Sequence, residues 1–252
     1  MGRDAIQIQM TDNIAVLTID RPSANAIDLD TARELGNALS SLVERNDIGA
    51  VIVTGAGKCL SAGLDLKVIP TYDRSQQQAM VMEVNRLFGR LYDLPFPTIA
   101  AVNGHAIAGG VILALACDYR IGAEGDYKLG LAEMRVGVPF PVAALAIVQS
   151  ELSHKAARLM VLTARNLNPR EALSYGVLDE LQPPELLLDR SMEVAREMAA
   201  LPRATYARIK RDLRAHARSR VDDAIDNRHE PMLESWLGAE TIEAASEALK
   251  KK

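Results

Sequence analysis

The chain has 252 residues, of which 48% are hydrophobic and 25% are charged, a balance typical of an ordinary globular protein. Its formal net charge of −4 gives no general attraction to nucleic acid or to anionic membranes. No apolar run reaches the roughly 18 residues that suggest a membrane-spanning helix, and the first residues, MGRDAIQIQM, lack the apolar segment of a signal peptide. Cys59 and Cys117 have no metal-ligand spacing and predict two reduced thiols in a cytoplasmic protein.

The N-terminal part of the chain alternates strand and helix patterns. The runs IQIQM and IAVLTI are separated by turn residues and predict a β-hairpin. Residues 28–44 have apolar side chains at helical spacing, and Thr31 and Glu34 have the spacing of a capping box. The run AVIVT at 50–54 predicts a buried strand.

The same alternation continues with a predicted helix over 75–94, the strand PTIAAV and an apolar stretch over 111–116 that predicts a buried helix. Strands that alternate with helices indicate an α/β fold. Beyond residue 141 the pattern is mainly helical, with helices predicted at 142–151, 153–163, 184–200, 203–218 and 239–250. We therefore expect an α/β core over 1–200 and a helical C-terminal region over 201–252.

Two segments repeat the order strand, glycine turn, helix: VIVTGAGKCLSAGLDLK and TIAAVNGHAIAGGVILALACD. Glycine permits a close backbone approach, and the start of a helix leaves N–H groups without partners. If the two strands are neighbours, two N–H groups can point at one oxygen and form an oxyanion hole. The alternative is that these glycines only form tight turns, and composition and spacing leave both interpretations open.

These two segments, together with VLTIDRPSANAID at Val16–Asp28, resemble the signature of the crotonase (enoyl-CoA hydratase/isomerase) superfamily. Further similarity lies in CDYRI, LGLAEMRVG and EALSYGVLDELQP, and it extends over most of 12–185. The resemblance implies a spiral of ββα units with a helical C-terminal region that builds homotrimers or hexamers. It also implies an acyl-CoA thioester substrate, with the Leu64 and Gly109 N–H groups as the oxyanion hole.

The side chains at the family's acid positions distinguish between reactions. Hydratases of this family place two glutamates around a water molecule, but here Ile112 stands at one position and Glu133 at the other. A single glutamate of raised pKa in an apolar pocket suits the transfer of a proton from C2 to C4 of an enoyl thioester. The alternative for Glu133 is a solvated surface side chain, which is the usual place of a glutamate.

Finer similarity favours one branch of the family. The runs IAGG, CDYRI, LGLAE and VGVPFP resemble the mitochondrial-type Δ3,Δ2-enoyl-CoA isomerases, although Ala132 replaces the asparagine of that pattern. We therefore predict an isomerase of fatty-acid or related acyl-CoA metabolism. Two alternatives remain: a hydratase, hydrolase or decarboxylase of the same fold, and a non-catalytic module that binds RNA or a partner protein.

The resemblance also implies contacts with the substrate and its coenzyme A, and it implies neither a metal nor a redox cofactor. The residues at these positions are Ser23, Ala24, Ala62, Gly63, Asp65, Leu66, Ile112 and Lys251. Ser23 replaces a lysine of some relatives, so Lys67, Lys250 and Lys251 are candidates for the phosphate contacts, the last two from a neighbouring subunit.

Other polar residues have a structural as well as a functional interpretation. Asp65 is either a second acid or the cap of the next turn, and His105 either lines the pocket or has a structural role. Asp118 and Arg120 are predicted to form structural pairs. The basic stretch 203–220 could face RNA, but an apolar stripe of Tyr206, Ile209 and Leu213 favours a packed helix.

Overall fold

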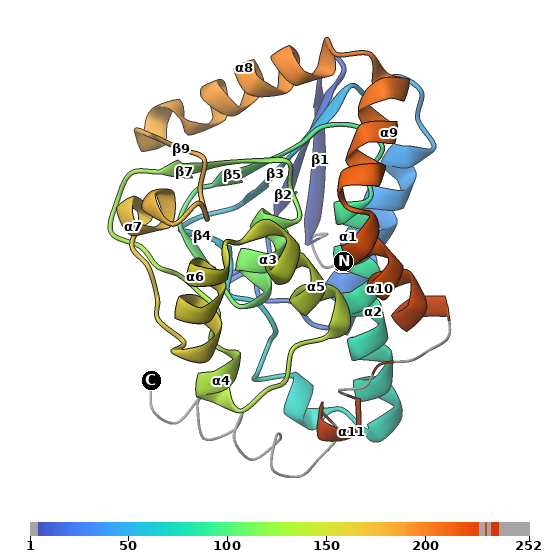
Figure 1. The fold of residues 1–252 in the computed structure, drawn as a ribbon, viewed down its shortest axis with the longest axis vertical. Helices are drawn as coiled ribbons and strands as arrows, with labels where there is room; N and C mark the ends of the chain where they lie inside the picture. Colours follow the sequence, from blue (N-terminus) through green and yellow to red (C-terminus); the bar gives the residue numbers. More distant parts are fainter. Residues whose placement is uncertain (1–4, 227–229, 231–232, 237–252) are drawn as a thin grey trace.

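The computed structural model describes residues 5–226, 230 and 233–236 (Figure 1). The predicted helix over 239–250, with Lys250 and Lys251, lies outside the described residues. Among the described residues, no helix combines the length and the apolar character that crossing a membrane requires.

The strands form two sheets. The main sheet has the strand order β1-β2-β3-β5-β7-β9, and the small sheet has the order β4-β6-β8. Only the β1–β2 hairpin is antiparallel among these pairs of described strands; every other neighbouring pair is parallel. The strands are β1 Ile6–Thr11, β2 Ile14–Ile19, β3 Ala50–Gly55, β4 Cys59–Ser61, β5 Thr98–Val102, β6 His105–Ile107, β7 Tyr119–Ala123, β8 Leu129–Gly130 and β9 Glu180–Gln182.

The helices complete a repeated ββα pattern, because α1, α2, α3 and α4 each follow a pair of strands. In the second, third and fourth units, the first strand joins the main sheet and the second joins the small sheet. The helices are α1 Leu29–Val43, α2 Arg74–Tyr92, α3 Gly109–Leu115, α4 Glu133–Val136, α5 Val142–Glu151, α6 His154–Ala157, α7 Pro169–Ser174, α8 Leu187–Ala199, α9 Arg203–Leu213, α10 Ala215–Asp226 and α11 Leu233–Trp236. The α/β fold class and the ββα units are therefore confirmed.

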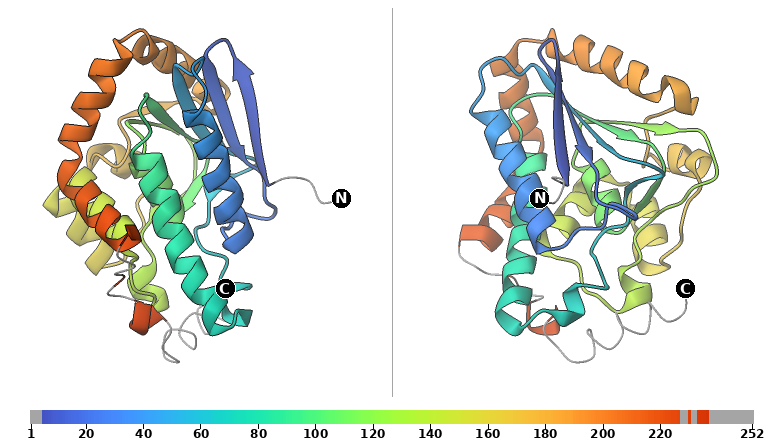
Figure 2. Two further views of the ribbon diagram at one scale, coloured as in Figure 1. Left: turned by 90° about the vertical axis from the view of Figure 1, so that its right-hand side faces the viewer. Right: turned by 180° about the vertical axis from the view of Figure 1, so that it is seen from behind.

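Helices on different sides of the main sheet create the core. Helix α8 packs against β3, β5 and β7. Helices α1 and α2 run side by side and away from α8 (Figure 2). Helix α10 packs against both α2 and α5. The hairpin, the strand after residue 97 and the buried helix α3 agree with the sequence-based predictions.

The predicted capping box of the first helix is wrong. Asp28 is the N-cap, and its carboxylate accepts the Thr31 N–H at 2.8 Å. Glu34 instead accepts the Ile6 N–H at 2.9 Å and ties α1 to β1. Thr31 and Glu34 both lie inside the helix, because the helix begins before them.

Two predicted helices are interrupted. The segment predicted as one helix over 153–163 contains the short helix α6 followed by a π-helical turn over Arg158–Leu162. The predicted helix over 203–218 divides at Arg214 into α9 and α10. At this break the Arg214 guanidinium points inward and donates to the Tyr92 carbonyl oxygen at 2.7 Å.

Within the single chain, the apolar stripe predicted on α9 does not face the core. Ile209 is 62% exposed and Leu213 is 81% exposed, whereas Tyr206 is half-buried. Lys210 of α9 and Arg214, directly after it, are buried instead. A helical pattern can identify a shared face, but it cannot show that a polar network rather than the apolar side chains faces the core.

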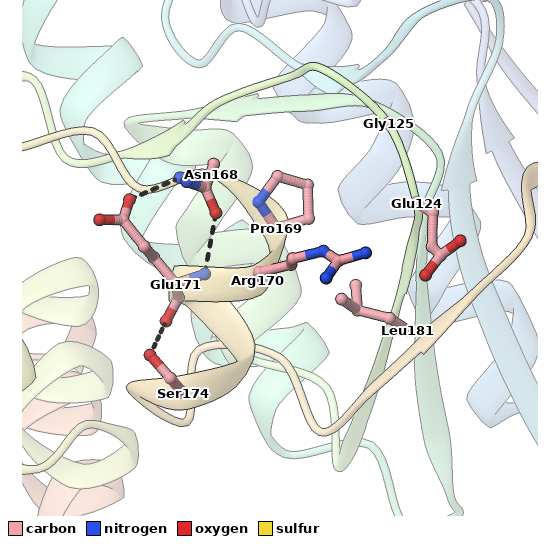
Figure 3. Close-up of a pocket in the computed structure, with 8 residues that line it drawn as sticks. All are labelled: Glu124, Gly125, Asn168, Pro169, Arg170, Glu171, Ser174 and Leu181. Atoms are coloured by element: carbon pink, nitrogen blue, oxygen red, sulfur yellow. Dashed lines mark hydrogen bonds between the residues drawn. The ribbon is translucent and has the colours of Figure 1, made fainter.

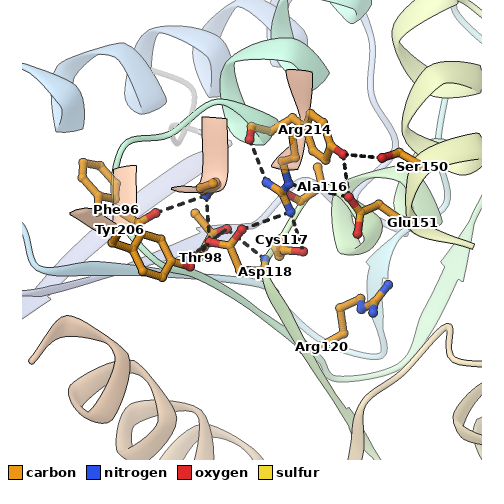
Figure 4. A network of polar contacts seen from close by, with 12 residues as sticks. Phe96, Thr98, Ala116, Cys117, Asp118, Arg120, Ser150, Glu151, Tyr206 and Arg214 are labelled. Atoms are coloured by element: carbon orange, nitrogen blue, oxygen red, sulfur yellow. Dashed lines mark hydrogen bonds and ion pairs between the residues drawn. The ribbon is translucent and has the colours of Figure 1, made fainter. Parts of the chain in front are cut away.

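One carboxylate holds these buried cations (Figure 4). Asp118, directly before β7, lies 2.7 Å from Lys210 Nζ and 3.0 Å from Arg214 Nη2. Its carboxylate also accepts the Tyr206 hydroxyl at 2.9 Å and the Thr98 N–H at 2.9 Å. Burial lowers the pKa of Lys210, and the Asp118 charge opposes that shift. Asp118 therefore ties the C-terminal helices to the sheet.

Arg120 makes a separate ion pair. Its Nε lies 2.9 Å from Asp179 Oδ2, and this pair joins β7 to the residue before β9. The predicted structural pairing of Asp118 and Arg120 is confirmed, although the two residues pair with different partners.

Replacing Asp118→Asn is expected to lower the free energy of unfolding by about 3–5 kcal/mol, because two buried cations would lose their counter-charge. Denaturant titration followed by circular dichroism measures the loss. Asp47→Asn is the control, because it removes an exposed pair with Arg45 and should change stability very little. Equal losses in the two variants would contradict the role given to Asp118.

Candidate active site

Two glycine turns meet beside the small sheet. Strands β4 and β6 are parallel neighbours, and each leads directly into one of these turns. Gly63 has a φ of +76°, and a Cβ added there would lie 2.8 Å from the Gly109 nitrogen. The backbone approach predicted from the sequence is therefore confirmed at Gly63 and Gly109.

The second glycine of the pair has a different role. A side chain at Gly110 would collide with the Ser61 carbonyl oxygen, so Gly110 lets α3 pack closely on β4. Ala108, which precedes the pair, has a φ of +50°. Its N–H donates to the Gly130 carbonyl oxygen at 2.7 Å. A non-glycine residue in this conformation stores strain of about 1–3 kcal/mol, so the surrounding bonds hold the turn in place.

The two predicted oxyanion-hole donors are available to a ligand. Neither the Leu64 nor the Gly109 N–H donates to another group in the part of the chain that the structure describes. Residues next to Leu64 are fixed, because Gly63 O accepts the Ile27 N–H at 2.7 Å and Asp65 N donates to Ile27 O at 2.9 Å. The assignment of these donors to a thioester oxygen stays a prediction.

A cavity of about 100 Å³ lies against both turns. Its wall contains the predicted residues Ala62, Leu64, Leu66, Gly109, Ile112 and Glu133. It also contains residues that sequence reasoning did not place there: Val84, Phe88, Ile107, Ala108, Ala132, Val136, Val138, Pro139, Pro141 and Ala144. Apart from Glu133, no lining side chain carries a polar group. The apolar face of α2 indicated burial, but it did not distinguish the protein core from a ligand cavity.

Glu133 is the acidic group of this cavity. It begins α4, is 8% exposed, and its Oε2 has no hydrogen-bond partner among the described residues. Burial raises the pKa of Glu133 to about 7, because the apolar surroundings disfavour the charged form. The surface alternative for Glu133 is therefore wrong. Ile112 lines the same cavity and is fully buried.

The predicted coenzyme A positions before α1 lie outside the cavity wall. Ser23 is exposed, and the Ala24 carbonyl oxygen accepts the Ala62 N–H at 2.9 Å. This bond places the 23–24 turn next to the glycine turn that follows β4. Contact of Ser23 and Ala24 with coenzyme A stays a prediction.

Asp65 has structural partners. Its Oδ2 accepts Arg21 Nη1 at 2.8 Å, and its Oδ1 accepts the Lys67 N–H at 3.1 Å. The turn-capping alternative is therefore confirmed, and the Asp65 carboxylate does not line the cavity. The exposed Lys67 side chain remains a candidate for a phosphate contact.

His105 also has the structural role. It lies on β6, and its Nδ1 accepts the Lys128 N–H at 3.2 Å. It is not part of the cavity wall. Because His105 lies on the strand that leads to Gly109, the sequence alone could not show whether its side chain lines the cavity or has a structural role.

A second hollow, of about 610 Å³, lies at α7 (Figure 3). Glu124 and Arg170 project into it from different segments. Asn168 and Glu171 already form the capping box of α7. This hollow has no buried titratable group like Glu133 among its lining residues, so the apolar cavity is the candidate active site.

The fold and this cavity define a crotonase-type acyl-CoA enzyme, and comparisons with known proteins agree. The family model described as enoyl-CoA hydratase/isomerase matches residues 9–250. The chain therefore belongs to the enoyl-CoA hydratase/isomerase family, whose members act on acyl-CoA thioesters.

Individual relatives carry different activities in their names. A putative enoyl-CoA hydratase of Thermus thermophilus is 34% identical over 191 residues, which cover 74% of this chain and 75% of that protein. The crystal structure of human mitochondrial Δ3-Δ2-enoyl-CoA isomerase has a TM-score of 0.92 at 25% identity, with 98% of both chains covered. A structure of a Mycobacterium tuberculosis protein named as an enoyl-CoA isomerase has a TM-score of 0.82 at 31% identity and covers 92% of this chain and 98% of its own. A second structure names the same protein a probable enoyl-CoA hydratase.

Gly63→Ala is expected to destabilise the protein more than Gly176→Ala. Both glycines have positive φ, but a Cβ at Gly176 meets nothing within 4 Å, whereas a Cβ at Gly63 crowds the Gly109 nitrogen. We expect about 1 kcal/mol from the conformation alone at Gly176 and about 2–3 kcal/mol at Gly63. Equal losses in chemical denaturation would show that the two turns are not in close contact.

Glu133→Gln is expected to stabilise the protein at neutral pH. The folded-state pKa of about 7 lies above the unfolded value, so wild type binds the proton more tightly when folded. The stabilisation of the wild-type fold by this tighter proton binding is fully present below the unfolded pKa and is lost as pH rises through 7. The stability difference between Glu133→Gln and wild type should grow from pH 4.5 to 7.5 by about 2–3 kcal/mol and then level off. A difference that does not change with pH in urea titrations would contradict the buried state of Glu133.

Proposed function

We propose that the protein is a Δ3,Δ2-enoyl-CoA isomerase. The observation that supports this proposal is the single buried carboxyl group, Glu133, in an otherwise apolar cavity. The N–H groups of Leu64 and Gly109 border the same cavity and remain available to a ligand. The lining favours hydrocarbon acyl groups, because a polar acyl group would lose its hydrogen bonds with water there.

In the proposed reaction, the thioester oxygen accepts hydrogen bonds from the Leu64 and Gly109 N–H groups. The Glu133 carboxylate removes a proton from C2, and the electron pair forms a dienolate whose negative charge lies on the oxygen. Donors that are already in position stabilise such a charge by roughly 3–4 kcal/mol. Glu133 then returns the proton to C4, so the double bond moves from C3–C4 to C2–C3 without gain or loss of atoms.

The protonation behaviour of Glu133 suits both halves of this reaction. A group with a pKa of about 7 is present in acid and base forms near neutral pH, which is the condition for efficient proton transfer in both directions. Hydration needs a water molecule to be activated as well as a proton to be delivered. Ile112 is apolar at the position that the resemblance gives to a second acid.

Hydration is nevertheless the second candidate activity, because several relatives at similar identity are named as hydratases. Hydrolysis or decarboxylation on the same fold has no specific support in the cavity. Binding of RNA by the 203–220 stretch has little support, since four of its cations have acidic partners. Lys210 and Arg214 bind Asp118, Arg208 binds Asp212, and Arg218 binds Asp93.

We also propose a homotrimer or a hexamer, as the resemblance implies. The exposed apolar side chains of Ile209 and Leu213 on α9 support a contact with another subunit, because removing apolar surface from water is favourable. A cytoplasmic location is likewise a proposal.

Wild type is expected to convert 3-hexenoyl-CoA to 2-hexenoyl-CoA, and Glu133→Gln should lower kcat by about 10²–10⁴-fold, because the amide cannot accept the C2 proton. Absorbance of the conjugated product measures the rate. Glu124→Gln, in the α7 hollow, is the control and should retain activity. Wild type that hydrates 2-hexenoyl-CoA rapidly but does not isomerise 3-hexenoyl-CoA would overturn the proposal in favour of a hydratase.

The isomerase rate should also depend on pH. Because the carboxylate form of Glu133 removes the first proton, kcat/KM should rise with pH and reach half of its maximum near the pKa of about 7. Rates measured from pH 5 to 9 at constant ionic strength test this expectation. A profile that is flat through pH 7 would exclude Glu133 as the base.

A further inference from the structure

Two buried polar side chains lie behind the cavity and take no part in the proposed chemistry. Asn85 on α2 is fully buried, and Glu230, beyond the end of α10, is 6% exposed. Asn85 Nδ2 donates to Glu230 Oε2 at 2.6 Å. Burying a carboxylate at this depth costs free energy unless hydrogen bonds satisfy it. The donors that bind Glu230 therefore indicate which parts of the chain it holds in place.

Both side chains bind the first turn of α5. The Val142 N–H donates to Glu230 Oε2 at 3.0 Å, and the Ala143 N–H donates to Asn85 Oδ1 at 2.9 Å. The N-cap residue of α5 is Pro141, which offers no side-chain hydrogen bond. Glu230 and Asn85 therefore satisfy N–H groups that the helix itself leaves without partners, and the carboxylate lies at the positive end of the helix.

The residues next to these contacts line the cavity. On α2, Val84 precedes Asn85 and Phe88 follows it by about one turn, and both belong to the cavity wall. At the start of α5, Pro141 and Ala144 flank the two bonded N–H groups and also belong to the wall. The Asn85–Glu230 pair thus joins the two helices that carry these lining residues.

Helix α11 lies near the same region. Figure 1 shows α11 beside the N-terminal end of α2, where Glu234 pairs with Arg74 at 3.3 Å. Leu233 of α11 joins a cluster of apolar side chains at the cavity: Leu64, Leu66, Val81, Val136 and Val138. Glu230 and Leu233 therefore both contact residues at or next to the cavity wall.

We propose that Glu230 is a positioning residue that sets the length of acyl chain the cavity accepts. Through Asn85 it holds α5 against α2 and keeps the cavity near its volume of about 100 Å³, which suits a short hydrocarbon chain. Apolar contacts are non-directional, so without this pair the two walls can separate and admit longer chains. The inference rests on the proposed action on acyl-CoA thioesters.

The test measures the binding of butanoyl-, hexanoyl- and decanoyl-CoA by titration calorimetry. Wild type is expected to bind the two shorter thioesters more tightly than decanoyl-CoA. Glu230→Ala and Asn85→Leu should reduce this preference by about tenfold, the size of effect that a changed fit of the acyl chain produces. Glu230→Gln should keep more of the preference than Glu230→Ala does, because its amide oxygen can accept the hydrogen bonds from Asn85 and Val142.

Tyr92→Phe is the matched control. The Tyr92 hydroxyl also links α2 to α5, through Glu151 Oε1 at 2.5 Å and Ser150 Oγ at 3.1 Å, but it does so at residues outside the cavity wall. This variant should lose stability and keep the chain-length preference. If Tyr92→Phe changes the preference as much as Glu230→Ala does, or if Glu230→Ala leaves it unchanged, the proposal fails.

Two further measurements separate a changed fit of the acyl chain from misfolding or weaker binding of coenzyme A. Glu230→Asp retains the charge but is one methylene shorter, so it should weaken the preference even if Glu230→Ala does not fold. Coenzyme A without an acyl group should bind all variants equally. Because the saturated thioesters do not react, a wild type that shows the length preference but does not isomerise 3-hexenoyl-CoA would refute the proposed function and leave the role of Glu230 intact.

Discussion

Gly63 and Gly109 bring two backbone turns into contact, since a Cβ on Gly63 would lie 2.8 Å from the Gly109 nitrogen. The parallel pairing of β4 with β6 places these turns side by side, and Gly110 lets α3 pack closely on β4. Leu64 and Gly109 both line one cavity, and their N–H groups have no partners among the described residues. The contact between these two turns is therefore the contact that creates the candidate site.

The apolar character of that cavity has two consequences for Glu133. Removing water from the carboxyl group costs stability, and the same loss of water raises its pKa to about 7. A buried, unpartnered acid is unfavourable for folding but useful for proton transfer near neutral pH. Ile112, where related hydratases are expected to have a second acid, keeps the cavity apolar and so supports both effects.

Helix α9 reaches the core through charged groups rather than through an apolar stripe, whereas α10 buries Ala217, Val221 and Ala224. Asp118 holds Lys210 and Arg214 of the α9–α10 region against the sheet, and Glu230 binds α2 and α5 farther along the chain. Directional bonds of this kind fix the relative position of helices more narrowly than apolar contacts do. The apolar residues Ile209 and Leu213 are consequently left on the surface.

The sequence by itself determined the alternation of strands and helices, the two glycine turns and the identity of Glu133, because these depend on local periodicity and on recognisable motifs. It did not decide where Asp65 and His105 point, since each has a plausible partner both inside and outside a cavity. It misplaced the buried face of α9, and it gave no sign that Asn85 and Glu230 meet, because they are 145 residues apart. Only the tertiary structure decided these points, since burial and hydrogen-bond partners arise where distant segments pack together, and no local pattern records which segments those are.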